Sequence, residues 1–123
     1  MTISGGCHCG RNRFDVDGDI PEKLTRCTCT FCRTHGNLYA YFEPAQFTLK
    51  QGDSDATYRW QSKQVGHHFC SACGCYVYAD SPAFGRDGKW DGQTRRVGVN
   101  ARLIDDFEAA EHPVTVIDGL NLW

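Results

Sequence analysis

Three thiols crowd into Cys27-Thr28-Cys29-Thr30-Phe31-Cys32, and the rest of the chain is best read outward from this run. Three cysteines within six residues lie too close together to be spread through an ordinary hydrophobic core. Thiolates are preferred ligands of soft metal ions such as zinc. We therefore interpret the run as three ligands that converge on one metal ion.

Four further thiols occur in two close pairs, Cys7-x-Cys9 near the N-terminus and Cys70-x-x-Cys73 about sixty residues later. A pair separated by one residue can present both thiols on one side of an extended segment, because strand side chains alternate. The eight cysteines of the chain also permit a disulfide framework of the kind found in secreted proteins. Clustered cysteines in a reducing compartment more often bind metal, so we favour zinc over disulfides.

The composition is that of an ordinary folded protein, and the length suits a single domain over residues 1–123. The net charge is −2 and no block of five like charges occurs, so neither nucleic acids nor membranes are expected partners. No apolar run approaches the ~20 residues that span a bilayer. The first residues have neither a basic start nor an apolar stretch, so no signal peptide is visible. These features predict a cytoplasmic protein.

Short segments of alternating or apolar residues predict an all-β fold, a small zinc-stabilised sheet or sandwich of short antiparallel strands. Strands are expected at residues 13–17, 38–42, 47–50, 56–61, 76–80, 95–100 and 113–117. Residues 23–29 are expected to run extended into the three-thiol run. Residues 33–37 are predicted to form a turn, residues 81–94 a long exposed loop, and residues 103–111 a short helix.

One site is predicted to be structural, because Cys7, Cys9, Cys70 and Cys73 supply the four thiolates of a closed zinc site. Joining two pairs about sixty residues apart costs about 3.6 kcal/mol of loop-closure entropy. Binding of a structural zinc ion contributes roughly 10–16 kcal/mol, so metal binding outweighs that cost.

The other site is predicted to be catalytic, because Cys27, Cys29 and Cys32 supply only three ligands. Three protein ligands with one open position are the pattern of a catalytic zinc. Three thiolates leave the zinc complex with a formal charge of −1, which suits the binding of a substrate sulfur better than the generation of a free hydroxide. The chain is therefore expected to bind two zinc ions.

Several residues near these sites have no definite role in the sequence. Cys75 is the eighth thiol and is interpreted as a buried bystander, with a free thiol or an alternative ligand as the other readings. A distant Cys75 or a histidine could close the three-thiol site. His67 and His68 are neighbours in an expected strand and point to opposite faces, so at most one should reach that site.

Three motifs carry a family resemblance, and they are, in order, Gly5-Gly6-Cys7-His8-Cys9-Gly10-x-x-Arg13-Phe14, Cys27-x-Cys29-Thr30-x-Cys32-Arg33 and Phe69-Cys70-x-x-Cys73-Gly74. The chain resembles the glutathione-dependent formaldehyde-activating enzymes, a family that also includes centromere protein V. The resemblance extends from about residue 3 to residue 105. It implies an all-β fold with two zinc ions, a structural one at the outer two thiol pairs and a catalytic one at the central run.

The activity that the resemblance implies is carbon–sulfur lyase chemistry, the reversible joining of formaldehyde to glutathione to give S-(hydroxymethyl)glutathione. A small-molecule thiol, either a glutathione adduct or a related compound, is the expected partner. The alternative is a non-catalytic zinc-binding module that interacts with another protein. The oligomeric state is not readable from the sequence.

Overall fold

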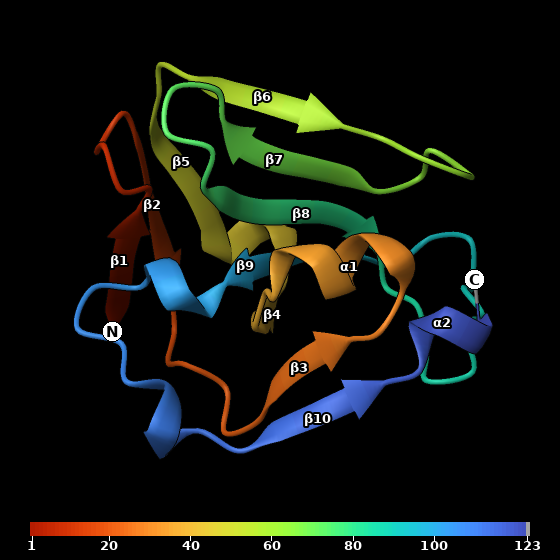
Figure 1. Ribbon diagram of the computed structural model, residues 1–123. Helices are drawn as coiled ribbons and strands as arrows, with labels where there is room; N and C mark the ends of the chain where they lie inside the picture. Colours follow the sequence, from red (N-terminus) through yellow and green to blue (C-terminus); the bar gives the residue numbers. More distant parts are fainter. Residues whose placement is uncertain (123) are drawn as a thin grey trace.

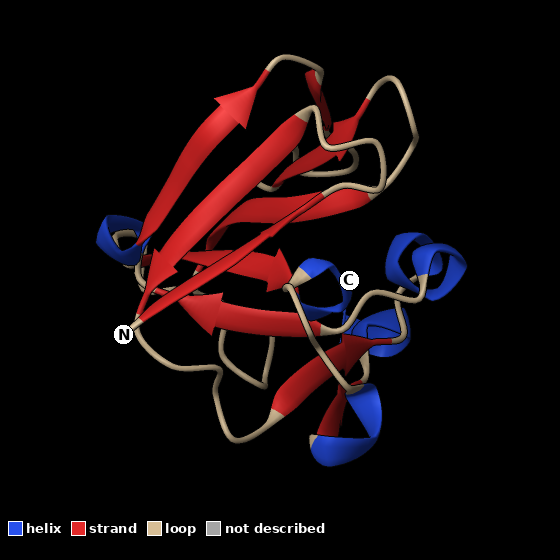
Figure 2. Cartoon of the chain, turned by 90° about the vertical axis from the view of Figure 1, so that its left-hand side faces the viewer, coloured by secondary structure: helices blue, strands red, loops and turns tan. Residues whose placement is uncertain are grey.

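The computed structural model describes residues 1–122, and in this part of the chain two β-sheets form the body of the molecule (Figure 1). The strands are β1 (Thr2–Gly6), β2 (Asn12–Asp17), β3 (Leu24–Cys27), β4 (Tyr39–Phe42), β5 (Phe47–Gly52), β6 (Asp55–Tyr58), β7 (Gly66–Cys70), β8 (Tyr76–Pro82), β9 (Arg95–Asn100) and β10 (Val114–Ile117). The helical segments are α1 (Thr30–His35), α2 (Gly119–Leu122), η1 (Pro44–Gln46), η2 (Ala101–Leu103) and η3 (Ala109–Glu111). Figure 2 shows how short the helices are beside the strands, which confirms the predicted all-β class.

The smaller sheet has the order β1-β2-β5 and the larger one the order β10-β3-β4-β9-β8-β7-β6. Neighbouring strands are antiparallel, as predicted, at every pair within the described residues except one. The exception is β10, which lies parallel to β3. A parallel pair requires a long connection, and most of the chain lies between β3 and β10. The local sequence pattern of a strand carries no information about that direction.

The main core lies between the two sheets. Phe14 and Val16 of β2 are fully buried there, because alternation along the strand turns both side chains inward. They belong to the same buried cluster as Val97 and Val99 of β9 in the larger sheet. Arg96, Gly98 and Asn100, which alternate with them, therefore face the other side of that sheet, where a second buried cluster contains the three central cysteines.

Residues 33–35 are helical, so the prediction of a turn over residues 33–37 is wrong for its first half. The Cys29 side chain caps the start of α1 by accepting a hydrogen bond from the Cys32 backbone N–H, at 3.3 Å. Gly36 ends the helix in the left-handed conformation, with φ of 66° and its N–H bonded to the Cys32 carbonyl. A thiol is an unusual helix cap, which explains why the sequence pattern did not reveal this helix.

Other boundaries differ by smaller amounts. Thr2–Gly6 forms strand β1, which the glycine-rich sequence did not predict, and β8 extends to Pro82. The helix expected in residues 103–111 is reduced to the short turns η2 and η3 on either side of a loop. No helix in the described part of the chain is long and apolar enough to cross a membrane.

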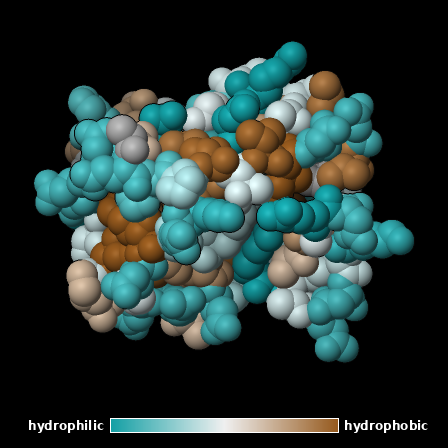
Figure 3. All heavy atoms as spheres, turned by 90° about the horizontal axis from the view of Figure 1, so that it is seen from below, coloured by the Kyte–Doolittle hydropathy of each residue, from teal (hydrophilic) through white to brown (hydrophobic). Residues whose placement is uncertain are grey.

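The outer surface carries scattered apolar groups. Val114 and Val116 on β10 are 41% and 50% exposed, and Leu120 and Leu122 on α2 are also exposed. Figure 3 views the molecule from below, the side on which β10 lies in Figure 1, and shows apolar patches separated by polar side chains.

Candidate metal centres

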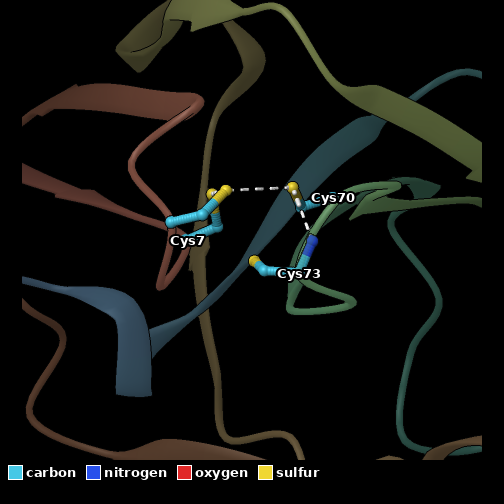
Figure 4. A group of neighbouring side chains, drawn as sticks. Cys7, Cys70 and Cys73 are labelled. Atoms are coloured by element: carbon cyan, nitrogen blue, oxygen red, sulfur yellow. Dashed lines mark hydrogen bonds between the residues drawn. The ribbon is translucent and has the colours of Figure 1, made fainter.

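The first thiol cluster consists of Cys7, Cys9, Cys70 and Cys73, which we call the four-cysteine group. The first pair follows strand β1, whereas Cys70 ends strand β7 and Cys73 lies in the turn between β7 and β8. All four sulfur atoms lie within 4.8 Å of one another. Figure 4 shows the thiols of Cys7, Cys70 and Cys73 directed toward a common point between the two turns. The fold thus brings together the four residues that the sequence predicted for the structural site.

The spacing of these thiols suits a tetrahedral metal ion. The Cys9 sulfur lies 3.6 Å from the sulfur of Cys7 and 3.6 Å from that of Cys70. Four thiolates at about 2.3 Å from a zinc ion would be separated by about 3.8 Å. Backbone N–H groups point at the sulfurs as well, from Asn12 to Cys7 and from Cys73 to Cys70, each at 3.4 Å. Such donors stabilise the thiolate form that a metal requires.

Negative charge is favoured on Cys73 in particular. Hydrogen bonds from the backbone N–H groups of Cys75 and Cys9 lower the pKa of the Cys73 thiol to about 5. A thiol with this pKa is deprotonated at neutral pH. The donor set and its electrostatics therefore fit a soft divalent cation.

The second cluster consists of Cys27, Cys29 and Cys32, which we call the three-cysteine group. Cys27 ends strand β3, Cys29 caps helix α1 and Cys32 lies within that helix, so one strand-to-helix junction positions all three. Their sulfurs lie within 4.8 Å of one another and all three residues are buried. The backbone N–H of Cys29 also points to the Cys27 sulfur at 3.5 Å.

The three thiols are electrostatically unequal. Hydrogen bonds from the Cys27 and Cys32 thiols lower the pKa of Cys29 far below its ordinary value. Hydrogen bonding with Cys27 and Cys29 raises the pKa of Cys32, and burial raises it further. Three crowded thiols cannot all ionise without a compensating cation, so this arrangement also fits a bound metal ion.

A cavity of about 290 Å³ opens beside the three-cysteine group, and all three cysteines form part of its wall. Its volume is at the lower end of the range of about 300–1,000 Å³ typical of small-molecule sites. The rest of the wall is largely aromatic or aliphatic, with Tyr39, Tyr41, Trp60, Val65 and Phe84 among its residues. No metal ligand outside the three cysteines is brought into this cluster from the described residues. The arrangement allows a small molecule to approach a metal bound at these thiols.

A buried chain of hydrogen bonds leads away from this cluster. The Tyr39 hydroxyl lies 3.3 Å from the Cys32 sulfur and donates to the Tyr76 hydroxyl at 3.3 Å. The Tyr76 hydroxyl lies 2.7 Å from Nδ1 of His67, which also lines the cavity. Burial lowers the pKa of His67 to about 4 and raises the pKa of both tyrosines. The imidazole and the two phenols are therefore uncharged at neutral pH.

His67 and His68 point to opposite faces, as their strand positions predicted. His68 lies 3.0 Å from the Asp55 carboxylate and stacks on the Tyr78 ring at 4.1 Å, away from the cavity. Cys75 belongs to neither thiol cluster and packs against the main core.

The aromatic wall of the cavity was missed in the sequence. The alternation of residues 38–42 places Tyr39 and Tyr41 on one face of β4, and this signal was available. The order of strands in the sheet decides which side of the molecule this face of β4 turns to. It also decides that Tyr76 and His67, from other strands, meet the same face.

Comparison with known proteins gives a consistent result. A family model described as glutathione-dependent formaldehyde-activating enzyme matches residues 2–115. A protein of Halomonas elongata named "Putative glutathione-dependent formaldehyde-activating enzyme" is 32% identical over 91 residues, which are 67% of this chain and 58% of that protein. This chain thus matches less than two thirds of that relative's length. A crystal structure of a Rhodobacter sphaeroides protein has the same fold, with a TM-score of 0.72 and 23% identity over 91% of this chain and 99% of that one.

Proposed function

Because the chain belongs to the glutathione-dependent formaldehyde-activating enzyme family, we propose that it is a zinc-dependent carbon–sulfur lyase. Its substrate in this proposal is S-(hydroxymethyl)glutathione or a closely related thiol adduct. The reaction joins the thiol to formaldehyde reversibly: the sulfur bonds to the carbonyl carbon, and the thiol proton ends on the oxygen. These atoms balance without any oxidant or reductant.

Two zinc ions are part of the proposal. The four-cysteine group would hold a structural ion, since four thiolates complete a tetrahedron and link two distant turns. The three-cysteine group would hold the second ion, which when bound supplies stabilisation of a substrate thiolate or polarisation of its hydroxymethyl oxygen.

The side chains around the cavity have roles of their own in this reaction. The aromatic wall, including Tyr41 and Trp60, would exclude water, which otherwise competes for formaldehyde. The Tyr76 hydroxyl accepts from Tyr39, which leaves its own proton to donate to Nδ1 of His67. The uncharged imidazole would then carry its proton on Nε2. Among the described residues that line the cavity, His67 is the one histidine. We therefore assign to it the hydrogen bond to the substrate oxygen.

One observation supports catalysis over a purely structural role. The three-cysteine group is buried in the fold yet forms the wall of a cavity, whereas a structural zinc site has four protein ligands. A non-catalytic interaction module has no need for a cavity at its metal.

The test compares Cys29→Ser with Cys75→Ser, both loaded with zinc. Exchange between formaldehyde, glutathione and their adduct is followed by NMR, and bound zinc is counted by mass spectrometry. We expect Cys29→Ser to lose one zinc ion and the catalysed exchange while its circular dichroism is unchanged, and Cys75→Ser to retain both. Full exchange activity in Cys29→Ser would refute the proposal. Absence of catalysis in the wild-type protein with two zinc ions bound would favour the interaction module.

A further inference from the structure

Arg96 presents to the cavity a charged group that has no carboxylate partner among the described residues. On β9 it precedes Val97, which packs in the main core, and strand alternation turns the Arg96 side chain to the cavity side. Its guanidinium stacks on the Tyr41 ring, with Cζ 3.8 Å from the ring centroid. The Nε atom is buried and has no hydrogen-bond partner among the described residues.

The neighbouring arginine shows the contrast. Arg95 points to the opposite side and pairs with Asp80 at 3.0 Å in an exposed position. No such ion pair joins Arg96 to any described residue. Tyr41 does not neutralise it, because burial raises the pKa of this phenol to about 12 and the ring stays uncharged.

The remaining wall of the cavity supplies no carboxylate as a counter-ion, and its anionic groups are the three thiolates proposed to hold zinc. Within the described residues, the lining contains no aspartate or glutamate, and Arg96 is its sole arginine or lysine. A half-buried guanidinium with an unsatisfied N–H is costly unless a ligand completes its hydrogen bonds. The planar guanidinium matches a carboxylate, with which it can form two parallel hydrogen bonds.

The same lining distinguishes between kinds of carboxylate. An amino-acid head group carries an ammonium beside its carboxylate, and the described lining offers no acidic side chain to receive that ammonium. A carboxylate without an adjacent ammonium fits a lone arginine. The rim residues Gln61, Ser62 and Gln64 are neutral hydrogen-bonding groups, which suit the amide bonds of a peptide.

We propose that Arg96 is a specificity residue that binds an isolated carboxylate of the thiol substrate, of the type found at the glycine end of glutathione. The substrate sulfur would then lie at the three-cysteine group, while the zwitterionic head group stays near the neutral rim or in solvent. This inference rests on the proposed function, since it takes the cavity to be the substrate site.

The test is a binding cycle on the zinc-loaded protein, measured by titration calorimetry. Glutathione is compared with its glycine monoethyl ester, in which an uncharged ethyl ester replaces that carboxylate, on the wild type and on Arg96→Gln. We expect each single change to weaken binding by about 10- to 100-fold, as for loss of a hydrogen bond between charged groups. The ester should bind the variant no more weakly than glutathione does, because both changes remove the same interaction.

Arg95→Gln is the matched control, an adjacent arginine on the same strand, and should leave glutathione affinity unchanged. Arg96→Lys should recover part of the affinity, because it restores the charge without the planar geometry. Metal content and the melting temperature establish that each variant is folded. The inference is overturned if the ester binds the wild type as tightly as glutathione does. It is also overturned if the ester binds Arg96→Gln more weakly than glutathione does, so that the two losses of affinity multiply.

These outcomes are separable from the fate of the proposed function. Normal exchange activity, together with equal affinity of the wild type for the ester and for glutathione, would remove the role of Arg96 and leave the lyase proposal intact. The expected binding cycle in a protein without catalysis would support the carboxylate site and refute the lyase. Failure of glutathione to bind at all would overturn both.

Discussion

The four-cysteine group should contribute most of the stability that metal binding gives to this protein, and Cys9→Ser tests this with little disturbance of packing. Cys9 is exposed, so the substitution removes a ligand without creating a cavity in the core. The link between Cys9 and Cys70 closes a loop of 61 residues. In the chain-entropy treatment, a cross-link over that length stabilises the fold by about 4 kcal/mol through its restriction of the unfolded chain alone, which sets the smallest loss expected when the metal leaves.

A loss of about 4 kcal/mol is a large share of the roughly 5–15 kcal/mol that stabilises a typical domain. With an unfolding entropy of about 2.1 cal/mol/K per residue, it corresponds to a fall in melting temperature of roughly 15 °C for this chain. The measurement is calorimetry of zinc-loaded protein in the presence of a competing chelator, with bound zinc counted on the same sample.

Cys75→Ser is the control, since this thiol lies close to Cys73 in sequence but outside the four-cysteine group. It should keep both zinc ions and melt close to the wild type. The reasoning fails if Cys9→Ser retains both ions and the wild-type melting temperature. It also fails if Cys9→Ser loses one ion without a change in melting temperature, because the metal would then not restrain the chain.

Two further predictions concern buried side chains. The pKa of His67 is about 4 in the folded protein against 6.5 ordinarily, so the unfolded chain binds more protons than the folded protein between these pH values. The free energy of unfolding should therefore fall as pH drops from 6.5 to 4, by at most about 3 kcal/mol. Urea titrations of the wild type and His67→Gln across this range check this, and equal pH dependence in the two proteins would contradict it. Phe14 is fully buried and stacks on Phe47 at 5.8 Å, so Phe14→Ala should lower the free energy of unfolding by about 3–5 kcal/mol in a urea titration at neutral pH. A loss below about 1 kcal/mol would show that the core between the sheets closes around the missing ring.

The geometry of the two thiol groups explains how one small fold can hold two different centres. The four-cysteine group joins turns from different sheets, since β1 belongs to the smaller sheet and β7 to the larger. The three-cysteine group comes from one strand-to-helix junction and lies against the opposite face of the larger sheet. With a metal bound as proposed, the first arrangement would restrain the fold, whereas the second leaves one side of the cluster facing a cavity.

Local patterns in the sequence were enough to identify the thiol clusters and most strands. Metal ligands that are close in sequence must be close in space, and strand alternation is a property of a few consecutive residues. The grouping of Cys7 and Cys9 with Cys70 and Cys73 followed from counting ligands, although these pairs lie about sixty residues apart. The all-β class followed in the same way.

Tertiary structure decided what surrounds those thiols. The parallel pairing of β10 and the meeting of Tyr39, Tyr76 and His67 arise from contacts between distant strands. Arg96 shows most clearly what the sequence leaves open, because Arg95 and Arg96 are adjacent residues of the same type. Arg95 lies beside Asp80 and Arg96 lines the cavity. This difference is set only by the order of the strands and by the face of the sheet to which each side chain points. Spacing along the chain determines which atoms can share a metal, whereas packing of one strand against another determines what can reach it.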